Sequence, residues 1–117
     1  MRFRAKRIYL PASRSDGRRI LIDRLWPRGL TKEAAAIHYW ARSIAPSNEL
    51  RNWYQHDARK WPEFRRRYFV ELDANRDGVT ALFAELGNGL NTILFASKEE
   101  RLNNALALVE YLKTTAR

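Results

Sequence analysis

The chain has 117 residues, of which 45% are hydrophobic and 30% are charged. This length fits one domain that buries roughly two-thirds of the surface its unfolded form exposes. The absence of cysteine excludes disulfides, thiolate nucleophiles, iron–sulfur clusters and cysteine zinc sites. No segment approaches the roughly 18 consecutive apolar residues that span a bilayer, and no apolar signal-peptide region follows the basic residues 1–7. We therefore expect a cytoplasmic protein without a membrane partner.

The positive charge is concentrated near the N-terminus. The formal net charge is +9, from 22 basic and 13 acidic residues. Residues 1–32 hold ten basic residues against two acidic ones, whereas the remaining residues hold twelve against eleven. Such a segment attracts anions: nucleic acid, phosphorylated metabolites or acidic lipid surfaces. The alternative is a charge that only keeps a small domain soluble.

The first part of the chain predicts strands separated by turns. Residues 3–9 are expected to form a strand with partial alternation, and residues 11–17 a turn-rich loop. The apolar, β-branched segment 19–23 is typical of a buried strand. The sequence Trp26-Pro27-Arg28-Gly29 then interrupts the chain.

The next segment is less regular. Thr31 is expected to cap a short helix that ends at Ala36. Residues 37–44 are compatible with a helix or a strand. We favour the strand, because an Ile-His-Tyr-Trp sequence precedes Pro46.

The middle of the chain predicts helices. Ser47 can cap a helix whose apolar face carries Leu50, Trp53 and Tyr54. Pro62 suits the first turn of the next helix, and apolar residues at helical spacing continue through residue 72. A further apolar stripe covers residues 79–86 and stops at Gly87.

The last part predicts a strand followed by a helix. Residues 92–96 form a buried strand. Ser97 and Glu100 have the spacing of a capping box, which starts the last helix. Strands interleaved with helices indicate an α/β domain over residues 1–117. We expect a mostly parallel sheet of about four strands, flanked by helices as in flavodoxin-like or Rossmann-like layering.

Common nucleotide and metal motifs are missing from the sequence. There is no phosphate loop and no nucleophile elbow of the G-x-S-x-G type. The Gly87-Asn88-Gly89 segment precedes a strand instead of following one, so it is not a dinucleotide fingerprint. The two histidines, His38 and His56, lack the partners of a metal site, and we expect surface or structural roles for them. No metal site is predicted, and the sequence identifies no cofactor and no oligomeric state.

Polar residues follow each predicted strand, where the carboxyl ends of parallel strands meet at one edge of the sheet. Helix N-termini and arginine side chains at this edge would bind a phosphate or carboxylate. The predicted ligand-binding residues are Arg24, Trp26, Arg28, Ser47, Ser97 and Lys98.

Asp23 is the candidate for proton transfer if the protein is an enzyme, since it is a carboxylate at a strand end beside arginines. Trp26 can stack on a planar ligand or pack on the core. In the alternative interpretation Arg24 pairs with Asp23, the serines only cap helices and Lys98 is solvated. We expect Arg24 or Arg28 to line a concavity within reach of Ser97 or Lys98.

Several blocks of sequence, in order along nearly the whole chain, resemble the bacterial YeaO family. The most specific block is Asp23-Arg24-Leu25-Trp26-Pro27-Arg28-Gly29. The other matching blocks are Lys6-Arg7-Ile8-Tyr9, Ala45-Pro46-Ser47, Leu50-Arg51, the Trp61, Phe64, Tyr68, Glu71 and Leu72 stripe, and Thr92-Ile93-Leu94-Phe95.

The resemblance implies a cytoplasmic α/β domain of unknown function. Relatives in the broader family carry cysteine motifs that this chain lacks, and the family often has a histidine where Leu102 stands. Some members are catalogued as uroporphyrin-III C-methyltransferases. That activity needs sites for S-adenosylmethionine and a tetrapyrrole, and this short chain has no glycine-rich nucleotide loop. Binding of a small anionic molecule is the leading hypothesis, and a nucleic-acid-binding accessory protein is the alternative.

Overall fold

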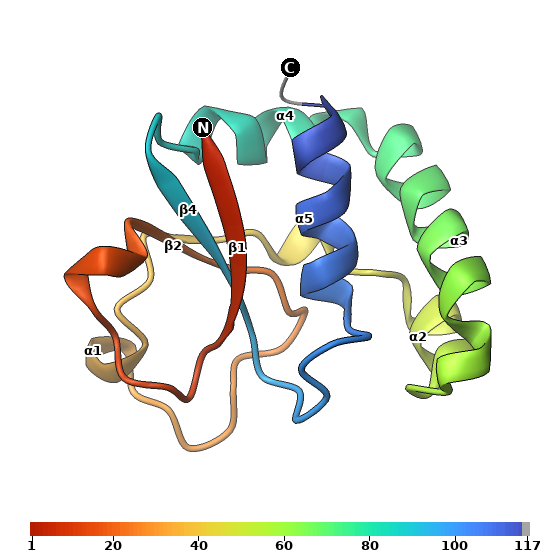
Figure 1. Cartoon of the computed structure of the whole chain (residues 1–117), viewed down its shortest axis with the longest axis horizontal. Helices are drawn as coiled ribbons and strands as arrows, with labels where there is room; N and C mark the ends of the chain where they lie inside the picture. Colours follow the sequence, from red (N-terminus) through yellow and green to blue (C-terminus); the bar gives the residue numbers. More distant parts are fainter. Residues whose placement is uncertain (116–117) are drawn as a thin grey trace.

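The computed structural model describes residues 1–115 and contains one four-stranded sheet with helices around it (Figure 1). The strands lie in the order β1-β4-β2-β3, and every neighbouring pair is parallel. Their bounds are β1 (Arg2–Arg7), β2 (Arg18–Leu21), β3 (Tyr39–Trp40) and β4 (Leu90–Phe95). The predicted α/β class with a parallel sheet is confirmed. The strand favoured within residues 37–44 is present, but it covers only two residues before a 3₁₀ turn at Arg42–Ile44.

Five α-helices surround the sheet. They are α1 (Lys32–Ala35), α2 (Asn48–Tyr54), α3 (Trp61–Ala74), α4 (Arg76–Glu85) and α5 (Asn104–Thr115). The predicted caps of the first two are confirmed, because the Thr31 hydroxyl accepts from the N–H of Ala34 and the Ser47 hydroxyl from that of Leu50. Asn75 caps α4 in the same way.

The two faces of the sheet carry cores of different size. On β2 and β4, Ile20 and Ile93 join the larger core, whereas the adjacent Leu21 and Leu94 join the smaller one, because successive side chains of a strand point to opposite faces. Helix α5 packs on β1 and β4, and α3 packs outside α5 against α2 and α4 (Figure 1). The smaller core lies under α1 and the loop that contains Trp26.

Asp16 is a fully buried carboxylate between β1 and β2. Its oxygens accept hydrogen bonds from Lys6 (2.9 Å) and Arg19 (2.5 Å) and pair with Arg4. Its backbone carbonyl accepts a hydrogen bond from the Thr92 hydroxyl of β4 (2.5 Å). One residue of the predicted turn therefore connects three strands.

The environment of Asp16 favours its charged form. Burial alone raises the pKa of a carboxyl, but hydrogen bonds from Lys6, the Ser13 backbone and Arg19 outweigh it and lower the pKa of Asp16 to about 2. Three of the ten cations in residues 1–32 are thus directed at one carboxylate. Part of the positive charge near the N-terminus therefore has a structural role, because it surrounds Asp16 inside the protein.

The capping box predicted at Ser97 and Glu100 is wrong. Helix α5 begins at Asn104, and the side-chain oxygen of Asn103 accepts from the N–H of Leu106 (3.0 Å) as its cap. Ser97 instead closes a turn by accepting from the N–H of Glu99 (3.0 Å). The segment 97–103 is a loop between the end of β4 and the start of α5, and Asn is as good a cap as Ser.

None of the helices within residues 1–115 combines the length and the apolar character needed to cross a membrane.

Asp16→Asn should lower the free energy of unfolding by about 3–5 kcal/mol, because it leaves Arg4, Lys6 and Arg19 close together without a compensating charge. Urea titration monitored by tryptophan fluorescence measures the change. Glu63→Gln is the matched control, since Glu63 pairs with two arginines on the exposed surface of α3, and it should have a much smaller effect. Equal losses in the two variants would contradict a special role for Asp16.

Asn103→Ala should destabilise the protein by about 1 kcal/mol, the usual cost of removing a helix cap. Ser97→Ala should cost less, because its hydroxyl closes only a loop turn. Denaturant titration of both variants decides between the two positions. A larger loss for Ser97→Ala would restore Ser97 as the residue that starts the helix.

Candidate functional site

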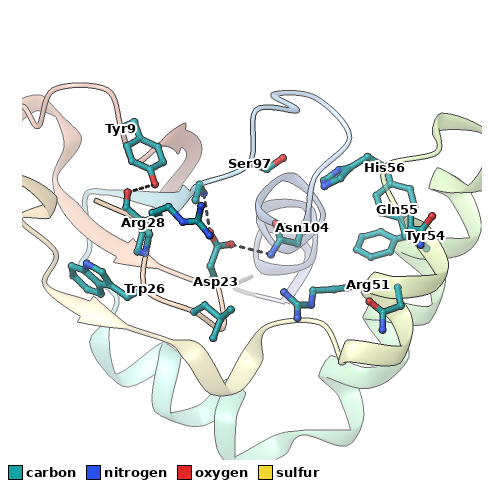
Figure 2. Close-up of a pocket in the computed structure, with 15 residues that line it drawn as sticks. Tyr9, Asp23, Trp26, Arg28, Arg51, Tyr54, Gln55, His56, Ser97 and Asn104 are labelled. Atoms are coloured by element: carbon teal, nitrogen blue, oxygen red, sulfur yellow. Dashed lines mark hydrogen bonds between the residues drawn. The ribbon is translucent and has the colours of Figure 1, made fainter. Parts of the chain in front are cut away.

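A pocket of about 530 Å³ lies at the carboxyl edge of the sheet (Figure 2). Tyr9 follows β1, Asp23 follows β2, and Ala96 and Ser97 follow β4, so three strand ends contribute to it. The remaining walls come from residues 25–28, from the last turn of α2 with the residues after it, from Phe64 of α3 and from the start of α5. The volume is in the range of sites for small ligands.

Asp23 lies among these strand ends and connects them. Its carboxylate accepts from the N–H of Ala96 (2.8 Å) and the side-chain amide of Asn104 (3.3 Å), and its carbonyl accepts from the Trp40 indole (2.7 Å). Burial raises the pKa of Asp23, while these hydrogen bonds and the charge of Arg51 oppose the rise only in part. Asp23 therefore holds β4 and α5 in place with a carboxyl that is less acidic than usual.

Two arginines reach the pocket from different elements. Figure 2 shows Arg28 on the side of Tyr9 and Arg51 on the side of α2, with Asp23 between them in the view. The Tyr9 hydroxyl fixes the backbone of Arg28 by donating to its carbonyl (2.8 Å). Arg51 donates to the side chain of Asn48 (2.7 Å), which leaves further N–H groups of its guanidinium available. Together they give the pocket two cations against one carboxylate.

The predicted site residues separate into two groups. Arg28 and Ser97 line the same pocket as Asp23, whereas the exposed Lys98 does not line it. Arg24 points elsewhere: it donates to the carbonyl of Pro46 (3.2 Å), and its Nε is buried without a partner among residues 1–115.

Ser47 lies with Arg24 on a separate cavity of about 170 Å³. Glu71 accepts from both the backbone N–H (2.9 Å) and the hydroxyl (2.6 Å) of Ser47. Ser47 therefore connects the start of α2 to α3, and it does not line the pocket that contains Arg28.

Trp26 packs on the core and also lines the pocket, so its role toward a ligand stays a prediction. It lines the pocket, yet its indole N–H donates to the Leu30 carbonyl (2.6 Å) and its ring packs edge-on against Trp40 at 5.4 Å. Its ring belongs to the smaller core, so only part of the side chain is available to a ligand.

A family model described as the inactive DUF488-N3 subclade, DUF488-N3i, matches residues 2–117. This chain belongs to that family. The DUF488-N3i chain is 37% identical over 114 residues to "Uncharacterized protein YeaO" of Escherichia coli (strain K12), with 97% of this chain and 99% of the relative covered. It is 35% identical over 115 residues to "Uncharacterized protein Rv3073c" of Mycobacterium tuberculosis (strain ATCC 25618 / H37Rv), with 95% and 93% covered.

The YeaO-like resemblance is thus confirmed over the whole chain. No solved structure matches it. Leu102, the position at which the resemblance suggests a histidine, packs against the larger core, and its carbonyl accepts from the Tyr54 hydroxyl (2.6 Å). It is outside the pocket lining of this DUF488-N3i protein.

Reasoning from the sequence missed the wall that α2 contributes. Arg51, Tyr54 and His56 line the pocket, although the α2 segment predicts only a core-facing helix and His56 only a surface or structural residue. The block Leu50-Arg51, which is part of the YeaO resemblance, was the one signal that pointed here. Helical spacing places residues on a face of a helix, but it does not say which strand ends that face will meet.

The pKa values of the buried Asp16 and the half-buried Asp23 of this DUF488-N3i protein should be shifted in opposite directions. Asp23 should have a pKa above the ordinary value of 3.8, and Asp16 one near 2. Because the pKa of Asp23 is higher in the folded state than in the unfolded state, ionisation of Asp23 disfavours folding. Its contribution to the free energy of unfolding therefore falls as the pH rises from 3.8 through the folded-state pKa. Asp16 contributes stability above pH 3.8 that is lost as the pH falls toward 2. Carboxyl ¹³C NMR titration measures both values, and the reverse order would contradict this assignment.

Proposed function

We propose that this DUF488-N3i protein binds a small anionic molecule, bearing a phosphate or a carboxylate, in the pocket at the carboxyl edge of the sheet. The observation that carries the proposal is the position of Arg28. Its guanidinium makes no hydrogen bond or ion pair within residues 1–115, yet the side chain lines the pocket opposite Arg51 (Figure 2). An arginine that lines a concave site and is not paired with a carboxylate is available to bind an anion in a fork.

Two observations favour binding over chemical conversion. Both carboxylate oxygens of Asp23 already accept hydrogen bonds from Ala96 and Asn104, so Asp23 has a positioning role before any ligand arrives. The family description calls the subclade inactive. Proton transfer by Asp23 would require a ligand group to compete with these donors.

The other two hypotheses receive less support. Nucleic-acid binding rests on the basic N-terminal third, but Arg4, Lys6 and Arg19 are engaged with Asp16. Tetrapyrrole methylation needs space for a large substrate and a methyl donor together, whereas about 530 Å³ suits one small ligand.

A thermal-shift screen against phosphorylated and carboxylated metabolites, nucleotides and tetrapyrroles identifies ligands, and calorimetry then measures affinity. Arg28→Ala and Arg51→Ala should each weaken binding about tenfold or more, because each removes a charged hydrogen bond. Arg14→Ala is the matched control, since it removes the same charge from the N-terminal third at an exposed residue outside the pocket.

The control separates the hypotheses. A pocket ligand should bind Arg14→Ala like the parent and respond modestly to salt. If all three substitutions weaken binding equally and the affinity falls steeply with salt, the ligand is a nucleic acid bound to a broad basic surface, and the pocket is not the binding site. Unchanged binding by Arg28→Ala would contradict the proposed site.

A further inference from the structure

Two consecutive residues after α2 have left-handed backbone conformations. Gln55 has a φ of 46° and His56 a φ of 57°. This region is unfavourable for residues other than glycine and is normally visited singly. The first of the two closes the helix by donating its N–H to the Arg51 carbonyl (3.1 Å), which a glycine would do with less strain. The backbone turn therefore does not explain why a glutamine and a histidine stand at these two positions. Their side chains must have another role that offsets the strain.

Core packing does not compensate for this strain. The side chains of Gln55 and His56 are exposed, and both line the pocket. The imidazole of His56 lies 5.7 Å from the Tyr54 ring at a tilt of 54°, its one aromatic contact among residues 1–115. Backbone strain held at exposed positions of a concave site is typical of residues that contact a ligand.

The pocket has aromatic groups on two sides. On one side Tyr54 stacks on Phe64 at 4.2 Å, with His56 beside it. On the other side are Trp26 and Tyr9. Figure 2 shows the ring of His56 turned toward Ser97, whereas the Tyr54 ring is buried in the larger core.

The same wall carries neutral hydrogen-bonding groups. Asn52 and Gln55, which carry side-chain amides, also line the pocket. Each amide offers both donors and an acceptor. A flat ring with polar edges would find stacking surfaces and hydrogen-bond partners here, while Arg28 and Arg51 hold an anionic group.

We propose, on the basis of the anion site argued above, that Gln55 and His56 form a specificity wall for a planar ring joined to the anion. The ligand then has the chemistry of a nucleoside monophosphate. It is either a free nucleotide or the terminal nucleotide of a strand. The ring stacks on the exposed imidazole of His56, and the phosphate lies between Arg28 and Arg51.

The test compares a nucleoside monophosphate with ribose 5-phosphate, which lacks the ring, by calorimetry. The nucleotide should bind about tenfold more tightly, the effect expected of one stacked base. His56→Gly and Gln55→Gly should reduce that preference by about threefold to tenfold while leaving ribose 5-phosphate affinity within about twofold. Both substitutions should also raise Tm by a few degrees, because they relieve the left-handed strain.

Ala36→Gly is the matched control. Ala36 has the same strain, with a φ of 46°, but lies outside the pocket. It should raise Tm without changing either affinity. His56→Ala removes the ring but keeps the strained backbone, so it should lose the nucleotide preference without the gain in Tm.

Equal binding of nucleotide and ribose 5-phosphate, or an unchanged preference in His56→Gly and His56→Ala, would overturn the specificity wall and leave the anion site standing. Failure of every phosphorylated or carboxylated probe to bind would instead overturn the anion site. A 5′-phosphorylated oligonucleotide in parallel distinguishes the sources. Tighter binding of the oligonucleotide identifies a strand end as the ligand, and tighter binding of the mononucleotide identifies the free molecule.

Discussion

The carboxylate of Asp16 is the constraint on which the arrangement of the sheet depends. It lies in a short turn between β1 and β2, yet it is bound by cations from both strands, and its carbonyl binds Thr92 of β4. Arg19 then continues the network by donating to the carbonyls of Ala35 (2.8 Å) and Ala36 (3.2 Å), which ends α1. A buried charge that lost these partners would be strongly unfavourable, so the strands must keep the register that supplies them.

That register also builds the pocket. Because β1, β4 and β2 are parallel neighbours, their carboxyl ends meet at one edge, where Asp23 connects β4 to α5. The two aspartates have opposite electrostatic surroundings. Asp16 has three cations and remains charged, whereas Asp23 has neutral donors and a raised pKa. The first belongs to a structural ion cluster, and the second makes a polar connection at the wall of the pocket.

Local patterns predicted most of the fold. The β-branched segments, the Thr31 and Ser47 caps and the parallel sheet followed from short-range chemistry, and the structure bears them out. Ser97 failed as a cap because the loop 97–103 intervenes before α5, and an equally good cap, Asn103, was available nearer the helix.

Only part of the pocket lining could be predicted from the sequence. Arg24 and Arg28 flank the same Trp-Pro pair, but one turns to Pro46 and the other enters the pocket. No spacing rule separates them, because the direction of each side chain is set by the tertiary packing of the loop. The α2 wall and the burial of Asp16 depend in the same way on contacts between segments far apart in the sequence.

The distribution of ion pairs shows why the net charge alone is a poor guide to the partner. Arg4, Lys6 and Arg19 bind one buried aspartate, and the Arg66-Arg67 pair shares Glu63 on the surface of α3. Five cations thus share two carboxylates, which orients them but leaves a net charge of +3 on the two groups together. Arg28, by contrast, has no carboxylate partner within the described chain and lies where strand ends, polar side chains and aromatic rings converge. Electrostatic attraction acts over the whole surface, but selective binding requires free donors in a fixed geometry. The proposed binding of an anion therefore depends on Arg28 and Arg51, two pocket arginines without an ion pair within residues 1–115, more than on the net charge of +9.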